Sequence, residues 1–158
     1  MIRLFALSLI LTAGIVFSCD TGGSESIRKE MSNVLNGSES SEMKLWRLES
    51  LNFNLAQAYI KENRPDEAIE ILMDLIRKNR EPHYIMGGSM KRSSAHYGME
   101  NIYYTTLAEA YTIKGDAINS GKATKKAADA AAMSDKLRPG EEKIEAAKKK
   151  KERDSILN

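Results

Sequence analysis

Apolar side chains recur at intervals of three and four along two long stretches of the chain, and this spacing predicts helices that each bury one face. In residues 51–72, two such apolar faces are separated by a short polar run. Asn63 tolerates the left-handed backbone that ends a helix, and Pro65 suits the first turn of the next helix. Asp66 and Glu67 place negative charge at the positive end of that second helix. This stretch therefore predicts two antiparallel helices joined by a tight turn, with apolar and small positions at Leu51, Leu55, Ala58, Tyr59, Ala68, Ile71 and Leu72.

The same spacing predicts a second hairpin nearer the C-terminus. Residues 101–114 carry an apolar face, and Gly115 followed by Asp116 provides the turn. The next helix, expected over residues 116–137, is rich in alanine and lysine and has only a narrow face to bury. Its buried positions are expected to be Ala123, Ala127, Ala130, Ala131 and Leu137.

The C-terminal region should form a separate unit over residues 139–158. Pro139 followed by Gly140 is expected to stop the preceding helix, because proline lacks the backbone N–H that a helix interior requires. A final capping helix would then begin at Glu141 and fray into a solvated tail. The lysines at 148–151 are offset by nearby acidic residues, which favours a solvated face over contact with lipid headgroups.

Two further patterns precede the first hairpin. Residues 26–35 have helical spacing, which is compatible with a short helix or with a solvated linker, and both interpretations stay open. Residues 41–62 predict one continuous helix that includes the first helix of the hairpin. Trp46 lies one turn before the hairpin begins, and we expect it to pack in the core.

Residues 83–100 break the helical pattern between the two hairpins. Glycine and serine pairs favour a loop, but Tyr84, Met86, Met90 and Tyr97 make the segment unusually apolar for a solvated one. The insert is either a surface loop or an extension of the next helix. Because long loops in compact domains are often functional, we favour a loop packed over the open face of the first hairpin.

The first hairpin resembles the tetratricopeptide repeat, a helical hairpin of about 34 residues. The resemblance covers residues 49–82 and departs from the family at Leu75 and Arg80, where alanine and proline are usual. In this family a leucine and a small residue let the second helix approach closely, a tyrosine packs over them, and an asparagine or glycine makes the turn. The residues that carry the match are Leu55, Ala56, Tyr59, Asn63, Ala68 and Leu72.

The second hairpin resembles the same family over residues 101–134. Its second helix is a poorer match, because Ser120 and Thr124 stand where the first hairpin has alanine and leucine. The resemblance implies an all-α fold of antiparallel helical hairpins, a tetratricopeptide-like α-solenoid of about two repeats with flanking helices. The matching residues of the second hairpin are Leu107, Ala108, Tyr111 and Gly115.

The resemblance also implies a groove, because the first helices of such repeats line a concave surface that binds peptides or helices of partner proteins. The set of groove residues is chemically mixed, so it does not identify the ligand, and each residue could equally be packed by a flanking helix. At least three repeats are usually needed for a stable stack, so the flanking helices, a second copy or a partner would supply the missing cover. The groove candidates are Phe53, Gln57, Ile60 and Lys61 in the first repeat and Thr105, Glu109, Thr112 and Ile113 in the second.

The N-terminus predicts a secretion signal over residues 1–18. Arg3 gives the positive start, and residues 4–16 form an apolar run that is short for a membrane span. The residues before Cys19 resemble a bacterial lipobox, with an aliphatic residue three positions before the cysteine and a small residue directly before it. Phe17 is bulkier than is usual between them.

The lipobox resemblance implies cleavage before Cys19 and a lipid on its thiol, so that residues 19–40 would be a flexible tether and the chain would be anchored to a membrane. The alternatives are an ordinary signal peptide or an uncleaved anchor. Cys19 is the only cysteine, so no disulfide is expected in the chain. The sequence does not assign the anchor to the inner or outer membrane.

Composition and motifs argue against several other functions. A net charge of +2 over 158 residues gives no strong basic field for nucleic acid. His83 and His96 have no ligand partners at metal-site spacing, so no metal or other cofactor is expected. Residues 115–124 look like a phosphate-binding loop, but the spacing of its glycines and the residue after Lys122 are wrong. With no nucleophile and base in a recognisable arrangement, an enzyme is not expected.

Three functional hypotheses remain from the sequence. The first is a lipid-anchored adaptor that binds other envelope proteins through the groove over residues 41–138 and can self-associate. The second is a surface-displayed lipoprotein that binds host or environmental ligands. The third is an accessory subunit of an envelope assembly or transport complex, with the chemistry in its partner.

Overall fold

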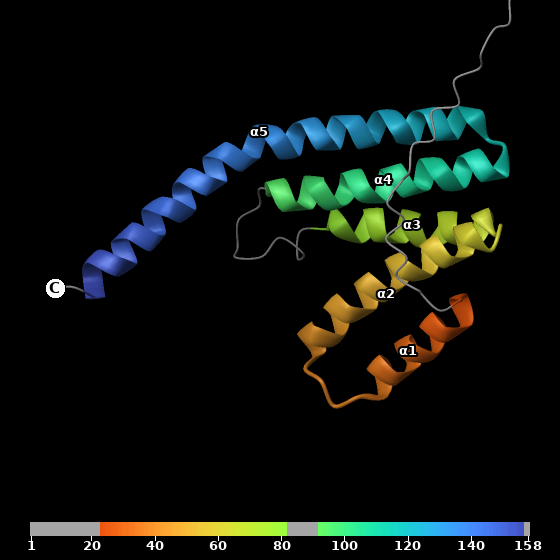
Figure 1. Ribbon diagram of the computed structural model, residues 1–158, viewed down its shortest axis with the longest axis horizontal. Helices are drawn as coiled ribbons and strands as arrows, with labels where there is room; N and C mark the ends of the chain where they lie inside the picture. The colour runs from red at the N-terminus through yellow and green to blue at the C-terminus, as the bar shows by residue number, and fades with distance from the viewer. Residues whose placement is uncertain (1–22, 82–91, 157–158) are drawn as a thin grey trace, which may run out of the picture.

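The protein is described by a computed structural model over residues 23–81 and 92–156, with side chains described as far as Arg153. Within these residues the chain forms helices and no strand, which confirms the predicted all-α fold of antiparallel hairpins (Figure 1). The helices are α1 (Ser24–Asn36), α2 (Ser41–Lys61), α3 (Pro65–Asn79), α4 (Ser94–Lys114) and α5 (Ala117–Ile156).

Both predicted turns are confirmed by their backbone geometry. Asn63, after the end of α2, has a φ of 57°, and Arg64 N–H donates to the Tyr59 carbonyl at 2.8 Å. Gly115, after the end of α4, has a φ of 81°. A residue with a side chain would be strained at that φ, so the glycine is needed for the turn.

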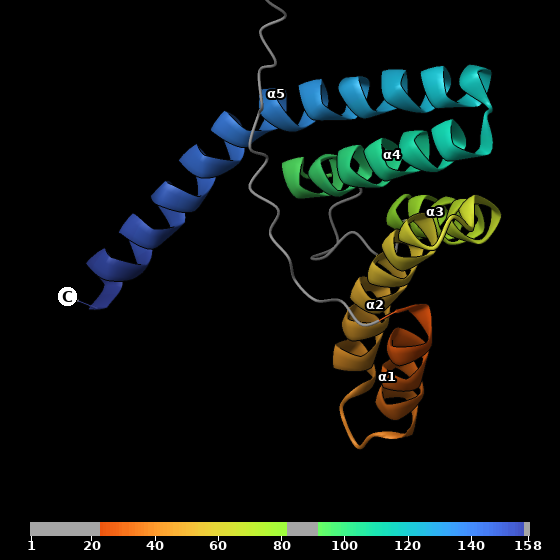
Figure 2. The same ribbon diagram turned by 45° about the vertical axis from the view of Figure 1, so that its right-hand side comes forward.

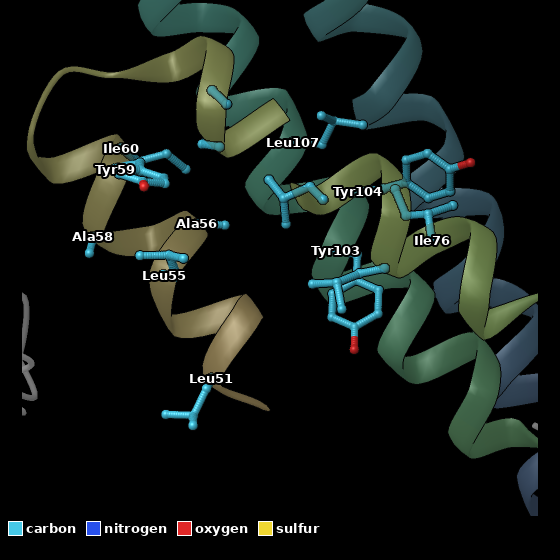
Figure 3. Close-up of a cluster of buried hydrophobic side chains, with 14 of the residues drawn as sticks. Leu51, Leu55, Ala56, Ala58, Tyr59, Ile60, Ile76, Tyr103, Tyr104 and Leu107 are labelled. Carbon is cyan, nitrogen blue, oxygen red and sulfur yellow. The ribbon is translucent and has the colours of Figure 1, made fainter. Parts of the chain in front are cut away.

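Each helix packs against the next one in the chain, and α2 also touches α4 (Figures 1 and 2). The small residues Ala56, Ala68 and Ala110 have no exposed surface, which lets neighbouring helix backbones approach closely. Leu72 and Leu75 of α3 fill the space between α2 and α4, and each contributes roughly 1.5–3 kcal/mol by its burial. Figure 3 shows how side chains of α2, α3 and α4 gather in this core.

The helical interpretation of residues 26–35 is confirmed, since they lie within α1. Ile27 and Val34 are buried against the rest of the core. The Arg28 guanidinium donates to the Tyr59 hydroxyl, and the Ser24 hydroxyl donates to Glu62 at 2.8 Å. The prediction of a flexible tether is therefore wrong for residues 24–36, which pack on the domain. The reason is that α1 buries its apolar stripe against α2.

The prediction of a loop over the whole insert is wrong, because α4 begins at Ser94 and not near residue 101. Ser93 caps this helix: its backbone N–H donates to His96 Nδ1 at 3.3 Å, and its hydroxyl lies 2.7 Å from the same atom. The capping box has histidine in the place of the usual glutamate or glutamine, so its sequence signal is weak. Residues 82–91 of the insert, with His83, lie outside the described residues.

The predicted break at Pro139 is also wrong. One helix, α5, runs from Ala117 to Ile156 with Pro139 inside it, so the expected capping helix is the second half of α5. Figures 1 and 2 show α5 curving along its length, which is how a helix accommodates an internal proline. A contact far away in the sequence supports the helix next to the proline: Ser94 N–H donates to Glu141 Oε1 at 2.9 Å.

Candidate functional site

Trp46 is exposed, which corrects the prediction that it packs in the core. Its side chain is 71% exposed, the largest value of any aromatic residue in the described chain. The reason is its position on α2: Leu48, Leu51 and Leu55 form the stripe that packs inward, and Trp46 points to the other side of the helix. An exposed tryptophan is uncommon on a water-facing surface and marks a possible contact site.

Trp46 shares its side of α2 with two of the residues predicted to line a groove. Phe53 and Gln57 follow it at helical intervals of seven and eleven residues, so all three lie on one face. Gln57 is exposed, and Phe53 is half-buried. The structure therefore places these two predicted groove residues on the same side of α2 as the exposed Trp46.

The exposed side of α4 has a similar composition. Ile102 is 43% exposed, and Met99 and Ile113 are each 39% exposed. Thr105 and Glu109, both predicted groove residues, are exposed between them on the same helix face. Met99 and Ile102 were not predicted, although their spacing from Thr105 and Glu109 would have placed them on the same face.

The two faces meet where α2 touches α4. The rings of Phe53 and Tyr103 lie with centroids 5.5 Å apart, and the Tyr103 hydroxyl donates to Glu49 Oε1 at 2.9 Å. Tyr103 is fully buried, so it joins α2 to α4 beneath the exposed side chains of the two helices. We call the surface above this contact the α2–α4 face, and define it by Trp46, Phe53, Gln57, Met99, Ile102, Thr105, Glu109 and Ile113.

The other predicted groove residues have different surroundings. Ile60 is buried in the core at 8% exposed, whereas Lys61 is the exposed last residue of α2. Thr112 is exposed, but its hydroxyl donates to the Ala108 carbonyl at 2.9 Å and lies 2.9 Å from the Ser120 hydroxyl. Thr112 thus faces α5, at the edge of the α2–α4 face.

A second notable group surrounds Glu100 of α4, which is only 2% exposed. Its carboxylate pairs with the guanidinium groups of Arg80 and Arg92, which come from the two ends of the segment between α3 and α4. Arg92 also lies over the ring of Tyr97, with its guanidinium carbon 4.3 Å from the centroid. Because a buried carboxylate needs compensating charge, this ion cluster is best explained as a fixed join between α3 and α4.

Two carboxylates each cap the N-terminus of a helix that lies far from them in the sequence. Hydrogen bonds from the Ser24 backbone N–H and hydroxyl lower the pKa of Glu62. Hydrogen bonds from the Ser94 hydroxyl and backbone N–H lower the pKa of Glu141 in the same way. Each carboxylate satisfies an N–H at the start of a helix, where the backbone has no internal partner.

We expect the Glu141 cap to give a pH-dependent contribution to stability. Since its folded pKa lies below the ordinary value of 4.5, the contribution is present above about pH 4.5 and is lost as the pH falls through the folded pKa. Thermal unfolding of Glu141→Gln should therefore show a lower Tm than the parent at pH 7 and a smaller difference at pH 3. Glu142→Gln, at an exposed neighbouring position, should change the Tm little at either pH; an equal effect would contradict the assignment.

The described residues contain no group of three acidic, histidine or cysteine side chains placed to hold a metal ion. A helix long and apolar enough to cross a membrane is likewise not found in the described part of the chain. The predicted signal peptide and Cys19 lie outside that part.

Comparisons of the chain with protein-family models, with curated proteins and with solved structures found no match.

Proposed function

We propose that this protein is a membrane-anchored adaptor that binds a partner protein of the bacterial cell envelope on the α2–α4 face. The observation that carries the proposal is that two helices which touch each other both carry exposed apolar side chains. Trp46 and Met99 are of residue types that are enriched at the centre of protein interfaces, and Ile102 adds exposed apolar surface beside Tyr103 in the sequence.

The surface is also held in place by the fold. The buried Tyr103 contacts Phe53 and Glu49 of α2, so the side chains on α4 have a defined position relative to those on α2. A preorganised surface loses less conformational entropy when it binds, which favours specific recognition. Gln57, Thr105 and Glu109 add polar groups around the apolar centre. An amphipathic helix or an extended segment with apolar anchors would fit this mixture.

The proposal of a tetratricopeptide-like repeat is supported by the packing of α2 with α3 and of α4 with α5. In the first pair, the positions that carry the resemblance are buried as that repeat requires, including Leu55, Ala56, Tyr59, Ala68 and Leu72. In the second pair the contact is made through Ala123 and Ala127, together with the half-buried Ser120. The hydroxyl of Ser120 donates to the Ala108 carbonyl at 3.1 Å, so the small side chain allows close approach.

The membrane anchor in the proposal rests on the sequence before Cys19, which resembles a lipobox. A diacylated cysteine would hold the domain at the membrane, since each buried CH₂ group contributes about 0.8 kcal/mol. The packing of α1 on α2 places the folded domain only a few residues after the cysteine. The adaptor would therefore present its partner close to the membrane surface.

The test is a crosslinking and pull-down experiment on the full-length chain in bacterial cells, with partners identified by mass spectrometry. The double variant Trp46→Ala, Ile102→Ala should reduce recovery of a stoichiometric partner about ten-fold, the loss typical of removing interface hot spots. The matched control is Met73→Ala, an apolar position that is 50% exposed on α3, a helix that contributes no residue to the α2–α4 face. Equal recovery of the same partners by parent and double variant would contradict the assignment of this face.

The anchor is tested in the same cells by replacing Cys19 with serine. We expect the variant to lose incorporation of labelled fatty acid and to move from the membrane fraction to the soluble fraction. A chain that keeps its label after Cys19→Ser would rule out lipidation at this residue. In that case the anchor would be excluded, and the pull-down experiment would still test the α2–α4 face independently.

A further inference from the structure

A second apolar surface lies on the other side of α2, as a groove of about 490 Å³ between α1 and α3. Leu55 and Tyr59 of α2 contribute to its lining. Met31 and Leu35 of α1 form one wall, and Ile71 of α3 belongs to the opposite wall. Leu35 is 60% exposed, so this wall is open to solvent. We call this surface the α1–α3 groove.

The charge at the edge of the α1–α3 groove is predominantly negative. Glu67 and Glu70 of α3 line it, against a single basic residue, Arg28, whose guanidinium donates to the Tyr59 hydroxyl. Glu67 is paired with Arg64 at 2.7 Å. Glu70 is exposed and has no charged partner among the residues that the structure describes. An occupant of this groove should therefore combine an apolar anchor with basic side chains.

The second half of α5 has this chemistry, and its side chains are exposed beyond the residues that contact α4. Glu141 contacts Ser94, the first residue of α4, so the part of α5 after Glu141 extends past the N-terminus of α4. Every side chain of residues 142–153 is exposed, and Figures 1 and 2 show this half of α5 extending away from the other helices. We call residues 142–153 the overhang.

One face of the overhang is apolar and flanked by lysines. Ile144, which is 59% exposed, and Ala147 lie three residues apart on one side of the helix. Lys148 and Lys151 lie on the same side, four and seven residues after Ile144. Further upstream, this side of α5 carries Leu137 and Glu141 at the same spacing and packs towards α4. The apolar face of the overhang is therefore a continuation of the side of α5 that packs on α4, but it lies past the first residue of α4.

We propose that the overhang of one copy docks in the α1–α3 groove of a second copy of this chain. Ile144 would enter between the Leu35 and Ile71 walls, with Lys148 and Lys151 facing Glu67 and Glu70. Both views place the overhang far from α1 of its own copy, so the contact forms between copies (Figures 1 and 2). Because it joins two different surfaces, repetition of the contact produces a ring or an open chain of copies. The contact is independent of the α2–α4 face.

Site-directed crosslinking of two differently tagged full-length copies, produced in the same cells, tests the proposal. One copy carries Ile144→Cys, the other carries Leu35→Cys, and a short membrane-permeant bismaleimide joins thiols that lie close together. We expect the mixed-tag product to form at least about five-fold more efficiently than with either control, because docking raises the local thiol concentration. The controls are Ile118→Cys on α5, 73% exposed, and Met73→Cys on α3, 50% exposed. Cells without engineered cysteines correct for any reaction of Cys19.

Charge reversal provides the second arm of the test. Glu67→Lys with Glu70→Lys in the groove should lower the crosslinking yield about five-fold, and Lys148→Glu with Lys151→Glu on the other copy should restore it. Glu70, Lys148 and Lys151 are exposed, and Glu67 is half-buried in an ion pair with Arg64 outside the apolar core, so folding is retained. Equal crosslinking at the control positions, or a yield unaffected by charge reversal, would overturn the proposal. So would a monomeric protein whose overhang lysines instead govern binding to vesicles of anionic lipid, because the occupant would then be a membrane.

Discussion

Tyr103→Ala is expected to lower the free energy of unfolding by about 3–5 kcal/mol, the range for removing a large buried aromatic side chain. Tyr103 has no exposed surface, and its ring contacts Phe53 across the junction of α2 and α4. Its removal leaves a cavity at the contact between these two helices. Urea unfolding followed by circular dichroism measures the change.

The matched variant Tyr103→Phe keeps the ring and removes only the hydroxyl that donates to Glu49. We expect it to cost about 1 kcal/mol, the value of one net hydrogen bond. Ile102→Ala, at the exposed neighbouring position, should cost less than about 1 kcal/mol. If Tyr103→Phe were as destabilising as Tyr103→Ala, the hydrogen bond rather than the ring packing would hold the two helices together. Tyr103→Phe keeps the ring contact with Phe53 that positions α4 relative to α2. The variant should therefore also retain partner binding on the α2–α4 face.

The second large effect is expected at Glu100. Replacing it with alanine should lower the free energy of unfolding by about 3 kcal/mol, because Arg80 and Arg92 lose the carboxylate that both pair with. Arg92 is largely buried, so water replaces the lost partner poorly. Arg80 is half exposed and limits the loss. Chemical unfolding at constant ionic strength is the appropriate measurement.

Glu109→Ala provides the control for Glu100→Ala, since both residues are on α4 and Glu109 is exposed. Its effect on the free energy of unfolding should stay within about 0.5 kcal/mol. A loss at Glu100 no larger than this would mean that the ion cluster contributes no net stability. The position of α4 relative to α3 would then depend on apolar packing alone.

The local pattern of the chain was sufficient to predict the hairpins. The spacing of Leu51, Leu55 and Tyr59 marked the buried side of α2, and all three are buried. Asn63 and Gly115 marked the turns, and both have the positive φ that those turns require. These predictions succeed because helix periodicity and turn chemistry depend on residues close together in the chain.

The predictions failed where distant residues decide the result. Pro139 lies within α5, where Glu141 reaches the first residue of α4. The prediction for Trp46 is wrong for a different reason: its spacing from Leu48 places it on the side of α2 opposite the packed stripe, so local helix geometry is sufficient to place it. A local signal at a proline gives only a tendency, and tertiary contacts can override it.

By itself, the sequence determined that this protein is a chain of amphipathic helices with two tight turns, because the spacing of apolar residues and the turn residues act locally. Only the tertiary structure decided which helix faces remain exposed. It placed Trp46 and Ile102 on neighbouring helices joined by Tyr103, and it left the side chains of the α5 overhang exposed. Both results follow from the lengths and packing of the helices, since a face is buried only as far as its neighbour extends.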